Sequence, residues 1–132
     1  MEILDKNPPN WSEIKVLNPP KTTVFCYGDT IFNPSGGEVP EDVIFHEQVH
    51  SDRQGNDPKG WWLKYINDRD FRLKEEVLAF GGQYAFIKRH YPSQAHKQAL
   101  FELATNLSTN YGFGFGYPQA EALIRRQAKN LV

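Results

Sequence analysis

The sequence predicts an α+β fold that is mostly helical. Two short β-rich runs, residues 22–27 and 30–33, flank Gly28-Asp29 and are typical of a β-hairpin. Further along the chain, apolar residues recur at helical spacing, most regularly in residues 69–91. We therefore expect a small N-terminal sheet packed on two successive helices, with further helices completing the chain.

The N-terminal part is expected to hold little regular structure. Proline-rich connectors at residues 7–11 and 18–21 predict that residues 1–21 are loosely extended, with one short strand at 13–17. The hairpin follows, and Pro34-Ser35-Gly36-Gly37 ends it.

The helices are predicted from their boundary residues. Pro40 opens a helix, and the acidic Glu41 and Asp42 complement its positive end. This helix is expected to end near Gln54, because Gly55-Asn56-Asp57-Pro58 forms a loop. Ser93 is the expected cap of a later helix. The remaining helices are expected at residues 58–66, 69–91, 93–109 and 118–131.

Composition narrows the class of protein. The 132 residues suit one compact domain, 1–132. A formal net charge of −1 with interspersed signs gives no attraction to nucleic acid or to an anionic membrane. A single cysteine, Cys26, allows no intrachain disulfide and indicates a reducing compartment. Without a signal-peptide pattern or an apolar span at its N-terminus, the chain is expected to be cytoplasmic.

The pentapeptide His46-Glu47-Gln48-Val49-His50 carries the main functional hypothesis. Positions i and i+4 of a helix share one face, so both imidazoles can bind the same metal ion. Glu47 lies about 100° around the helix from His46, where it can act as a general base on a metal-bound water. The simpler interpretation is two polar histidines on a partly exposed helix.

Glu75 and Glu76 are the candidates for a third metal ligand. Both lie near the start of the predicted helix 69–91, and a catalytic zinc site commonly takes two histidines, one glutamate and an open position. Ala79 follows Glu76 at the third position, and its small side chain would allow two helices to approach beside a metal. This context favours Glu76, with Glu75 as the alternative.

Several segments resemble the gluzincin group of zinc metallopeptidases and, within it, small phage-encoded metallopeptidases. They are Gly28-Asp29-Thr30-Ile31-Phe32-Asn33-Pro34, the HExxH pentapeptide, Trp61-Trp62, and Phe71-Arg72-Leu73 leading to Glu76. The resemblance covers about residues 22–125. It implies a minimal zincin-like fold, one Zn²⁺ bound by His46, His50 and Glu76, and Glu47 as catalytic base. It also implies a peptide or protein substrate and a bacterial host cytoplasm or phage setting.

The chain departs from many gluzincins at Phe80. Many gluzincins have an aspartate four residues after the glutamate ligand, and this aspartate orients the first histidine. In this chain Phe80 occupies that position, and its side chain cannot accept a hydrogen bond. Gln83, Glu75 or a backbone carbonyl is the expected substitute.

Other residues have two interpretations each. Residues 30–33 are either a substrate-binding edge strand or an edge strand that only packs on the active-site helix. Trp61 and Trp62 are expected to divide between core and surface, and Arg53 to form a surface salt bridge. Gly81-Gly82 predicts close helix packing or a kink.

The region after residue 110 leaves two questions open. The loop from Tyr111 to Pro118 alternates glycine with aromatic residues, and we expect a helix–helix connection rather than a mobile flap. Peptide hydrolysis also needs a donor to the tetrahedral oxyanion, for which Tyr111, Tyr117, His90 and His96 are candidates.

Three classes of function remain. The first is zinc-dependent hydrolysis of peptide bonds. The second is a catalytically inactive zinc-binding structural or virion-associated protein of the same fold. The third, a regulator of DNA-bound partners, would need a basic surface that the sequence lacks.

Overall fold

The computed structural model describes residues 1–131, and within them the fold is α+β and mostly helical, as predicted. The strands are β1 (Glu2–Leu4), β2 (Phe25–Tyr27) and β3 (Thr30–Phe32). The helices are α1 (Trp11–Ile14), α2 (Glu41–Gln54), α3 (Pro58–Asn67), α4 (Arg69–His90), α5 (His96–Thr109) and α6 (Tyr117–Lys129), with 3₁₀ turns η1 (Lys15–Leu17) and η2 (Ser93–Ala95).

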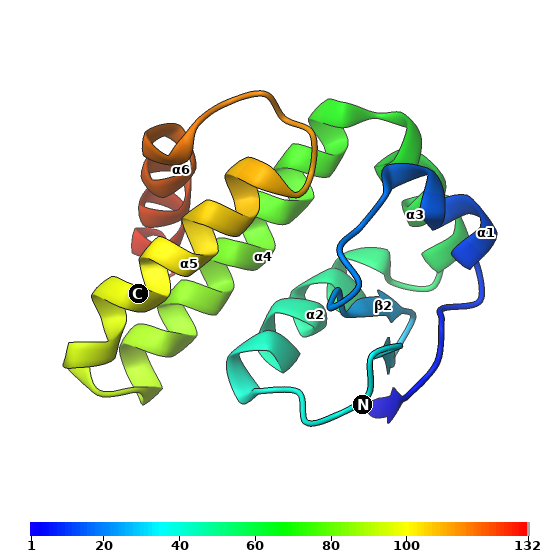
Figure 1. Cartoon of the computed structure of the whole chain (residues 1–132), viewed down its shortest axis with the longest axis horizontal. Helices are drawn as coiled ribbons and strands as arrows, with labels where there is room; N and C mark the ends of the chain where they lie inside the picture. The colour runs from blue at the N-terminus through cyan, green and yellow to red at the C-terminus, as the bar shows by residue number, and fades with distance from the viewer. Residues whose placement is uncertain (132) are drawn as a thin grey trace.

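Helix α4 is the central element of the fold. It packs against α2, α3, α5 and α6, and it runs through most of the molecule in Figure 1. Two adjacent glycines permit close packing on two sides, as predicted. A Cβ atom at Gly81 would lie 2.4 Å from Cγ of Gln127 on α6, and one at Gly82 would lie 3.2 Å from Cγ2 of Val49 on α2.

The apolar side chains form two clusters. The larger one joins the second half of α4 to α5 and α6, and includes Phe80, Leu107 and Ile124. The smaller one joins α1, the sheet and α3. Helix α2 packs on α4 and contacts the sheet through β2 and β3, so its inner face lies where the two clusters meet.

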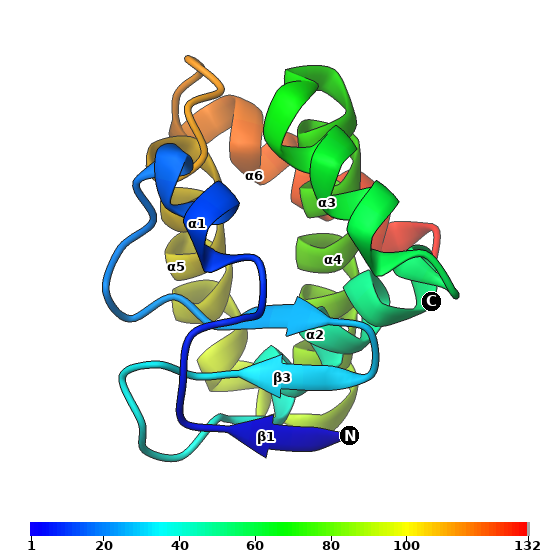
Figure 2. The same ribbon diagram turned by 90° about the vertical axis from the view of Figure 1, so that its right-hand side faces the viewer.

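The sheet has the order β1-β3-β2 (Figure 2). Strand β3 pairs antiparallel with β2, as expected of a hairpin, and parallel with β1. Residues 30–33 are therefore not an edge strand, because the N-terminal β1 covers the second side of β3. The edge strand of the hairpin is β2.

The prediction that residues 1–21 are loosely extended is wrong. They contribute β1, α1 and η1, and the strand expected at residues 13–17 is helical instead. In a helical turn Trp11 and Ile14 lie on the same side, which lets both reach the apolar cluster around Phe25. Ile14 is 1% exposed, so packing decides the local conformation.

Aspartates cap the two helices that follow the histidine helix. Asp57 accepts a hydrogen bond from the amide of Gly60 at the start of α3, and Asp68 accepts one from Phe71 at the start of α4. The expected cap at Ser93 is not formed, since that residue begins η2 without a side-chain hydrogen bond. No helix in the described residues has both the length and the apolar character that crossing a membrane requires.

Candidate metal centre

One turn of α2 presents a buried group of potential metal ligands. His46, Glu47 and His50 are 6%, 5% and 5% exposed, and one ligand atom from each lies within 4.8 Å of the others. The i, i+4 spacing places both imidazoles on the inner face of the helix. This group could hold a metal ion.

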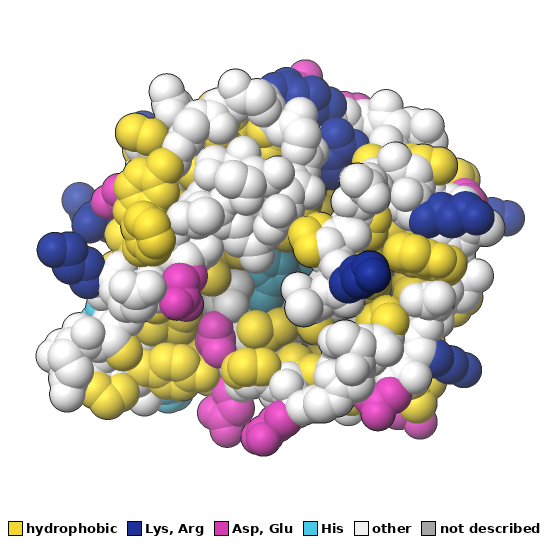
Figure 3. Space-filling view, in the orientation of Figure 1, with side chains coloured by type: hydrophobic (Ala, Val, Ile, Leu, Met, Phe, Trp, Pro, Cys, Tyr) yellow, Lys and Arg dark blue, Asp and Glu magenta, His cyan; other side chains and the backbone are white. Residues whose placement is uncertain are grey.

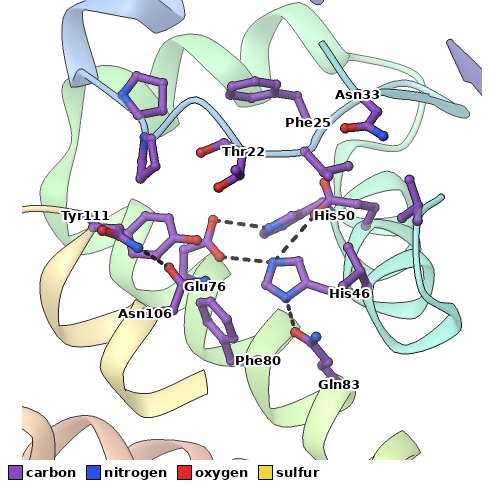
Figure 4. A pocket seen from close by; sticks show the side chains of 18 of the residues that line it. Thr22, Phe25, Asn33, His46, His50, Glu76, Phe80, Gln83, Asn106 and Tyr111 are labelled. Carbon is purple, nitrogen blue, oxygen red and sulfur yellow. Dashed lines mark hydrogen bonds and ion pairs between the residues drawn. The ribbon is translucent and has the colours of Figure 1, made fainter. Parts of the chain in front are cut away.

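Glu76 on α4 approaches the same two imidazoles. Its Oε1 lies 3.2 Å from Nε2 of His46, and its Oε2 lies 3.2 Å from Nε2 of His50 (Figure 4). Glu47 lies farther away, with Oε2 3.7 Å from Nε2 of His46. Ligands about 2.0–2.2 Å from a tetrahedral zinc ion are separated by about 3.4 Å. Glu76 approaches both imidazoles at close to that separation, whereas Glu47 lies within 4.0 Å of His46 alone among the described histidines, so Glu76 fits a shared ligand position better than Glu47.

Glu75 is engaged by other partners. Its carboxylate accepts hydrogen bonds from Nε and Nη2 of Arg53 at 3.1 and 3.0 Å, and from Nε1 of Trp61 at 2.8 Å. The predicted salt bridge of Arg53 therefore exists, but its acidic partner is buried rather than on the surface. Glu75 links α2, α3 and α4 and does not reach the imidazoles.

The expected division of the two tryptophans is wrong. Trp61 and Trp62 are both 6% exposed. Each indole N–H has a buried acceptor, since Trp61 donates to Glu75 and Trp62 donates to the carbonyl of Cys26 at 3.0 Å. With their polar atoms satisfied, both rings can lie inside the smaller apolar cluster.

Gln83 orients His46 by a hydrogen bond, which Phe80 cannot provide. Nε2 of Gln83 donates to Asp42 at 2.7 Å, so its Oε1 is the atom that lies 2.9 Å from Nδ1 of His46. Asp42 is held in turn by the hydroxyl of Tyr91 at 3.0 Å. Nδ1 of His46 therefore carries the proton, and the lone pair of Nε2 faces Glu76.

His50 is held mainly by packing. Its ring lies 5.2 Å from the ring of Trp61, and its Nδ1 is buried without a protein hydrogen-bond partner among the described residues. The hydroxyl of Tyr65 donates to Oε2 of Glu76 at 2.5 Å. The sequence analysis did not single out Tyr65. Tyr65 follows Trp61 by four residues and so lies on the same face of α3, and this spacing could have indicated that it reaches the site.

Burial sets the protonation of the acidic groups. It raises the pKa of Glu47 to about 8, with His46 opposing the shift and Glu76 adding to it. Burial also acts to raise the pKa of Glu76, but His50 and His46 outweigh it and hold that pKa well below its usual range. Burial raises the pKa of Tyr65 well above its usual value, and Glu76 adds to the shift. Tyr65 is therefore a neutral donor.

The cluster has the chemistry of a cation site. The lone pair of His46 Nε2 faces Oε1 of Glu76, and that oxygen is buried without a hydrogen-bond partner within residues 1–131. The buried carboxylate of Glu76 stays charged, because its pKa lies well below the usual range. Acceptors and anions gathered in a buried place are unfavourable unless a positive charge joins them. A divalent cation fits these residues.

A cavity of about 370 Å³ adjoins the cluster. In Figure 3 a histidine side chain is visible at the bottom of a hollow near the centre of the face. One side of the cavity is lined by residues 22–25, the last of which begins strand β2. Another side is lined by the end of α5. The cavity gives ligands access to the histidines.

Tyr111 is the one oxyanion candidate that lines this cavity. Its ring points toward Glu76 (Figure 4), and burial, with Glu76 and Glu47 adding, raises its pKa well above the usual value. Tyr117, His90 and His96 are not among the residues that line the cavity, and Nε2 of His96 lies 2.9 Å from the carbonyl of Tyr91. Tyr111 therefore keeps a proton that it can donate into the cavity.

The glycine-aromatic loop connects α5 to α6, as expected. Phe113 in its middle is 1% exposed and belongs to the larger apolar cluster. The side chain of Arg69 donates to the carbonyl of Phe113. This anchoring fixes the loop next to Tyr111 at its start.

Comparison of the chain with protein-family models, with curated proteins and with solved structures found no match.

Proposed function

We propose that this protein is a zinc-dependent peptidase in which His46, His50 and Glu76 hold one Zn²⁺ and Glu47 is the general base. The observation that carries the proposal is the contact of one buried carboxylate, Glu76, with Nε2 of both histidines at 3.2 Å. Two imidazoles and a glutamate are a recurrent ligand set of catalytic zinc. The order of these residues in the chain agrees with the resemblance to gluzincins.

The surroundings favour a catalytic site over a structural one. Structural zinc sites are closed by four protein ligands, whereas catalytic sites have three and keep one position open. Here three side chains converge beside a cavity that His46, His50 and Glu76 themselves line. The alternative, an inactive zinc-binding structural or virion protein, would have no use for that open side.

Two further side chains near the cluster support hydrolysis. When bound, zinc supplies a Lewis acid that acidifies water and polarises a carbonyl group. Glu47, next to His46 on α2, takes the proton of the attacking water and passes it to the leaving amine. Tyr111, protonated and lining the cavity, donates a hydrogen bond to the oxyanion that forms on the scissile carbonyl.

The segment that leads into β2 supports a peptide as the substrate. Thr22, Thr23 and Val24 precede β2 and line the cavity, and an extended peptide can lie along this segment through main-chain hydrogen bonds. Strand β2 itself does not offer its outer edge, because the carbonyl of Cys26 accepts hydrogen bonds from Gln54 and Trp62. Strand β3, expected earlier to bind the substrate, is covered on both sides.

The Glu47→Gln variant tests the assignment of the base. The purified zinc-loaded protein would be incubated with a mixture of short peptides, and the products identified by mass spectrometry. We expect Glu47→Gln to keep zinc at wild-type stoichiometry and to lose at least about 10²-fold in rate, because general-base catalysis contributes about 10²–10⁴-fold.

The matched control is Glu41→Gln, which makes the same change at an exposed position of α2. It should leave both zinc content and rate unchanged. Wild-type rates in Glu47→Gln would contradict the proposed base. Loss of zinc in Glu47→Gln would instead make Glu47 a ligand, as its membership of the buried group on α2 also allows.

A further inference from the structure

Arg72 is a buried cation without an acidic partner. It lies one turn before Glu76 on α4, is 9% exposed, and lines the same cavity. Within residues 1–131 no carboxylate lies within 4.0 Å of its guanidinium. Its Nη1 donates only to two main-chain carbonyls, those of Tyr65 at 2.8 Å and Ile66 at 3.3 Å. These bonds hold the guanidinium in place at the end of α3 without neutralising it.

One complete edge of this guanidinium has no hydrogen-bond partner within residues 1–131. Nε is buried and unpaired, and Nη2 makes no hydrogen bond within residues 1–131. Nε and Nη2 together form the side-on edge that binds a carboxylate with two parallel hydrogen bonds. Arg53 uses this same edge on Glu75, with Nε and Nη2 at 3.1 and 3.0 Å from its two oxygens.

The carboxylates beside the cavity do not neutralise the positive charge of Arg72. Glu47 and Glu76 face the histidines of the metal cluster, and neither lies within 4.0 Å of the guanidinium of Arg72. The guanidinium of Arg72 then remains as a single positive charge, 5.7 Å from the ring of Phe113 and 6.0 Å from that of Tyr65. Aromatic faces stabilise a guanidinium but do not neutralise it. An anion stabilises a buried charge of this kind, and a ligand in the cavity can supply one.

The position of Arg72 relative to the cluster suits the end of a peptide. Arg72 and the metal cluster share a neighbour, Tyr65, whose carbonyl accepts a hydrogen bond from Arg72 at 2.8 Å and whose hydroxyl donates to Glu76. The Cα atoms of Arg72 and Glu76 lie about 6 Å apart along the axis of α4. The terminal carboxylate of a peptide lies within about 4 Å of the last scissile carbonyl, because consecutive residues repeat every ~3.8 Å. A carboxylate held by Arg72 therefore directs the last peptide bond, rather than a distant one, toward the metal cluster.

The size of the cavity agrees with a short occupant. About 370 Å³ is near the lower end of the 300–1,000 Å³ typical of ligand pockets. Such a volume suits one or two residues at the end of a chain better than a long internal segment.

We infer that Arg72 binds the terminal carboxylate of the substrate, so that the protein removes the last residue of a peptide or splits a dipeptide. This inference rests on the proposed peptidase function and specifies its substrate class. In the reaction, water adds across the last C–N bond. Its oxygen joins the carbonyl carbon, and the proton taken by Glu47 passes to the amine of the released amino acid.

Ligand binding tests Arg72 separately from turnover. Trp61 and Trp62 line the cavity, so their fluorescence can report binding of N-acetyl-leucine and of its uncharged amide to the full chain. The titrations would be made with zinc-loaded protein and again after chelation, since a carboxylate can also bind the metal. We expect the acid to bind at least about tenfold more tightly than the amide in both forms, because charge-assisted bidentate pairs are among the strong hydrogen bonds.

Three variants make the result specific. Arg72→Met should reduce the preference for the acid to within about twofold while leaving the affinity for the amide unchanged, which shows that the cavity is intact. Arg72→Lys keeps the charge but loses the side-on edge, so it should retain only part of the preference. Arg125→Met removes a surface charge on α6 and should change neither affinity. Equal binding of acid and amide to the wild type, or an unchanged preference in Arg72→Met, would overturn the inference.

Hydrolysis separates this inference from the proposed function. One peptide would be offered to the zinc-loaded wild type as a free acid and as a C-terminal amide, and we expect release of the last residue from the acid alone. Equal cleavage of both forms, or cleavage at internal bonds, would keep the peptidase and refute the role of Arg72. Acid-selective binding without cleavage of either form would keep the role of Arg72 and refute the peptidase.

Discussion

Replacing Gln83 by leucine removes the side chain that joins the two helices next to the metal cluster. Two hydrogen bonds are lost, a buried one between His46 Nδ1 and Gln83 Oε1 at 2.9 Å and a partly buried one from Gln83 Nε2 to Asp42 at 2.7 Å. The imidazole then lacks the acceptor that fixes its proton on Nδ1. Loss of such a partner of a metal-bound histidine typically lowers metal affinity by about 10–100-fold, or about 1.4–2.7 kcal/mol.

The assay is competition for zinc between the protein and a chromophoric chelator at pH 7. We expect Gln83→Leu to fold, because leucine has a similar size and the position is 4% exposed. Its zinc affinity should be about 10–100-fold below that of the wild type. Gln48→Leu is the matched control, since Gln48 donates only to the neighbouring Asp52 on the exposed side of α2. An affinity of Gln83→Leu equal to that of both the wild type and the control would refute the role given to Gln83.

Three further predictions concern other parts of the molecule. Tyr111→Phe should lower kcat by about 10²-fold or more without changing zinc content, since one oxyanion donor is lost, and an unchanged kcat would exclude Tyr111. Burial raises the pKa of the Cys26 thiol to about 12, so it should stay protonated and unreactive toward a thiol reagent at pH 8 until urea unfolds the chain. Gly81→Ala should lower the free energy of unfolding, measured in urea, by about 1–2 kcal/mol, because the added Cβ would lie 2.4 Å from Gln127. This clash outweighs the higher helix propensity of alanine. A variant more stable than the wild type would contradict the close packing at Gly81.

The parts of the fold that follow from local chemistry were predictable. The helix with the histidines, the helix with Glu76 and the hairpin each have their own start signals, periodicity or turn residues within a short segment. The HExxH spacing likewise predicts that His46 and His50 share a face, and their imidazoles do approach one carboxylate. These features depend on neighbours a few positions away.

The features that sequence analysis missed depend on distant partners. Strand β1 forms only because β3 offers its free side, about 28 residues further along the chain. The two buried tryptophans depend on acceptors supplied by Glu75 and by the carbonyl of Cys26. No local pattern contains such pairings.

Two site residues could have been found from spacing alone. Arg72 precedes Glu76 by four residues and therefore shares its helix face, and Tyr65 follows Trp61 by the same interval. Spacing would not have given their roles. The unpartnered edge of Arg72 and the hydrogen bond from Tyr65 to Glu76 become visible only when α3 and α4 are placed together.

The most direct test of the metal centre is the zinc content of purified protein, measured by mass spectrometry for the wild type, Glu76→Gln and Glu75→Gln. The two variants change adjacent residues in the same way, but only Glu76 contacts the imidazoles. We predict close to one zinc per chain in the wild type and in Glu75→Gln, and a marked loss in Glu76→Gln. Equal zinc content in all three proteins, or no zinc in the wild type after reconstitution, would contradict the metal centre proposed for this fold.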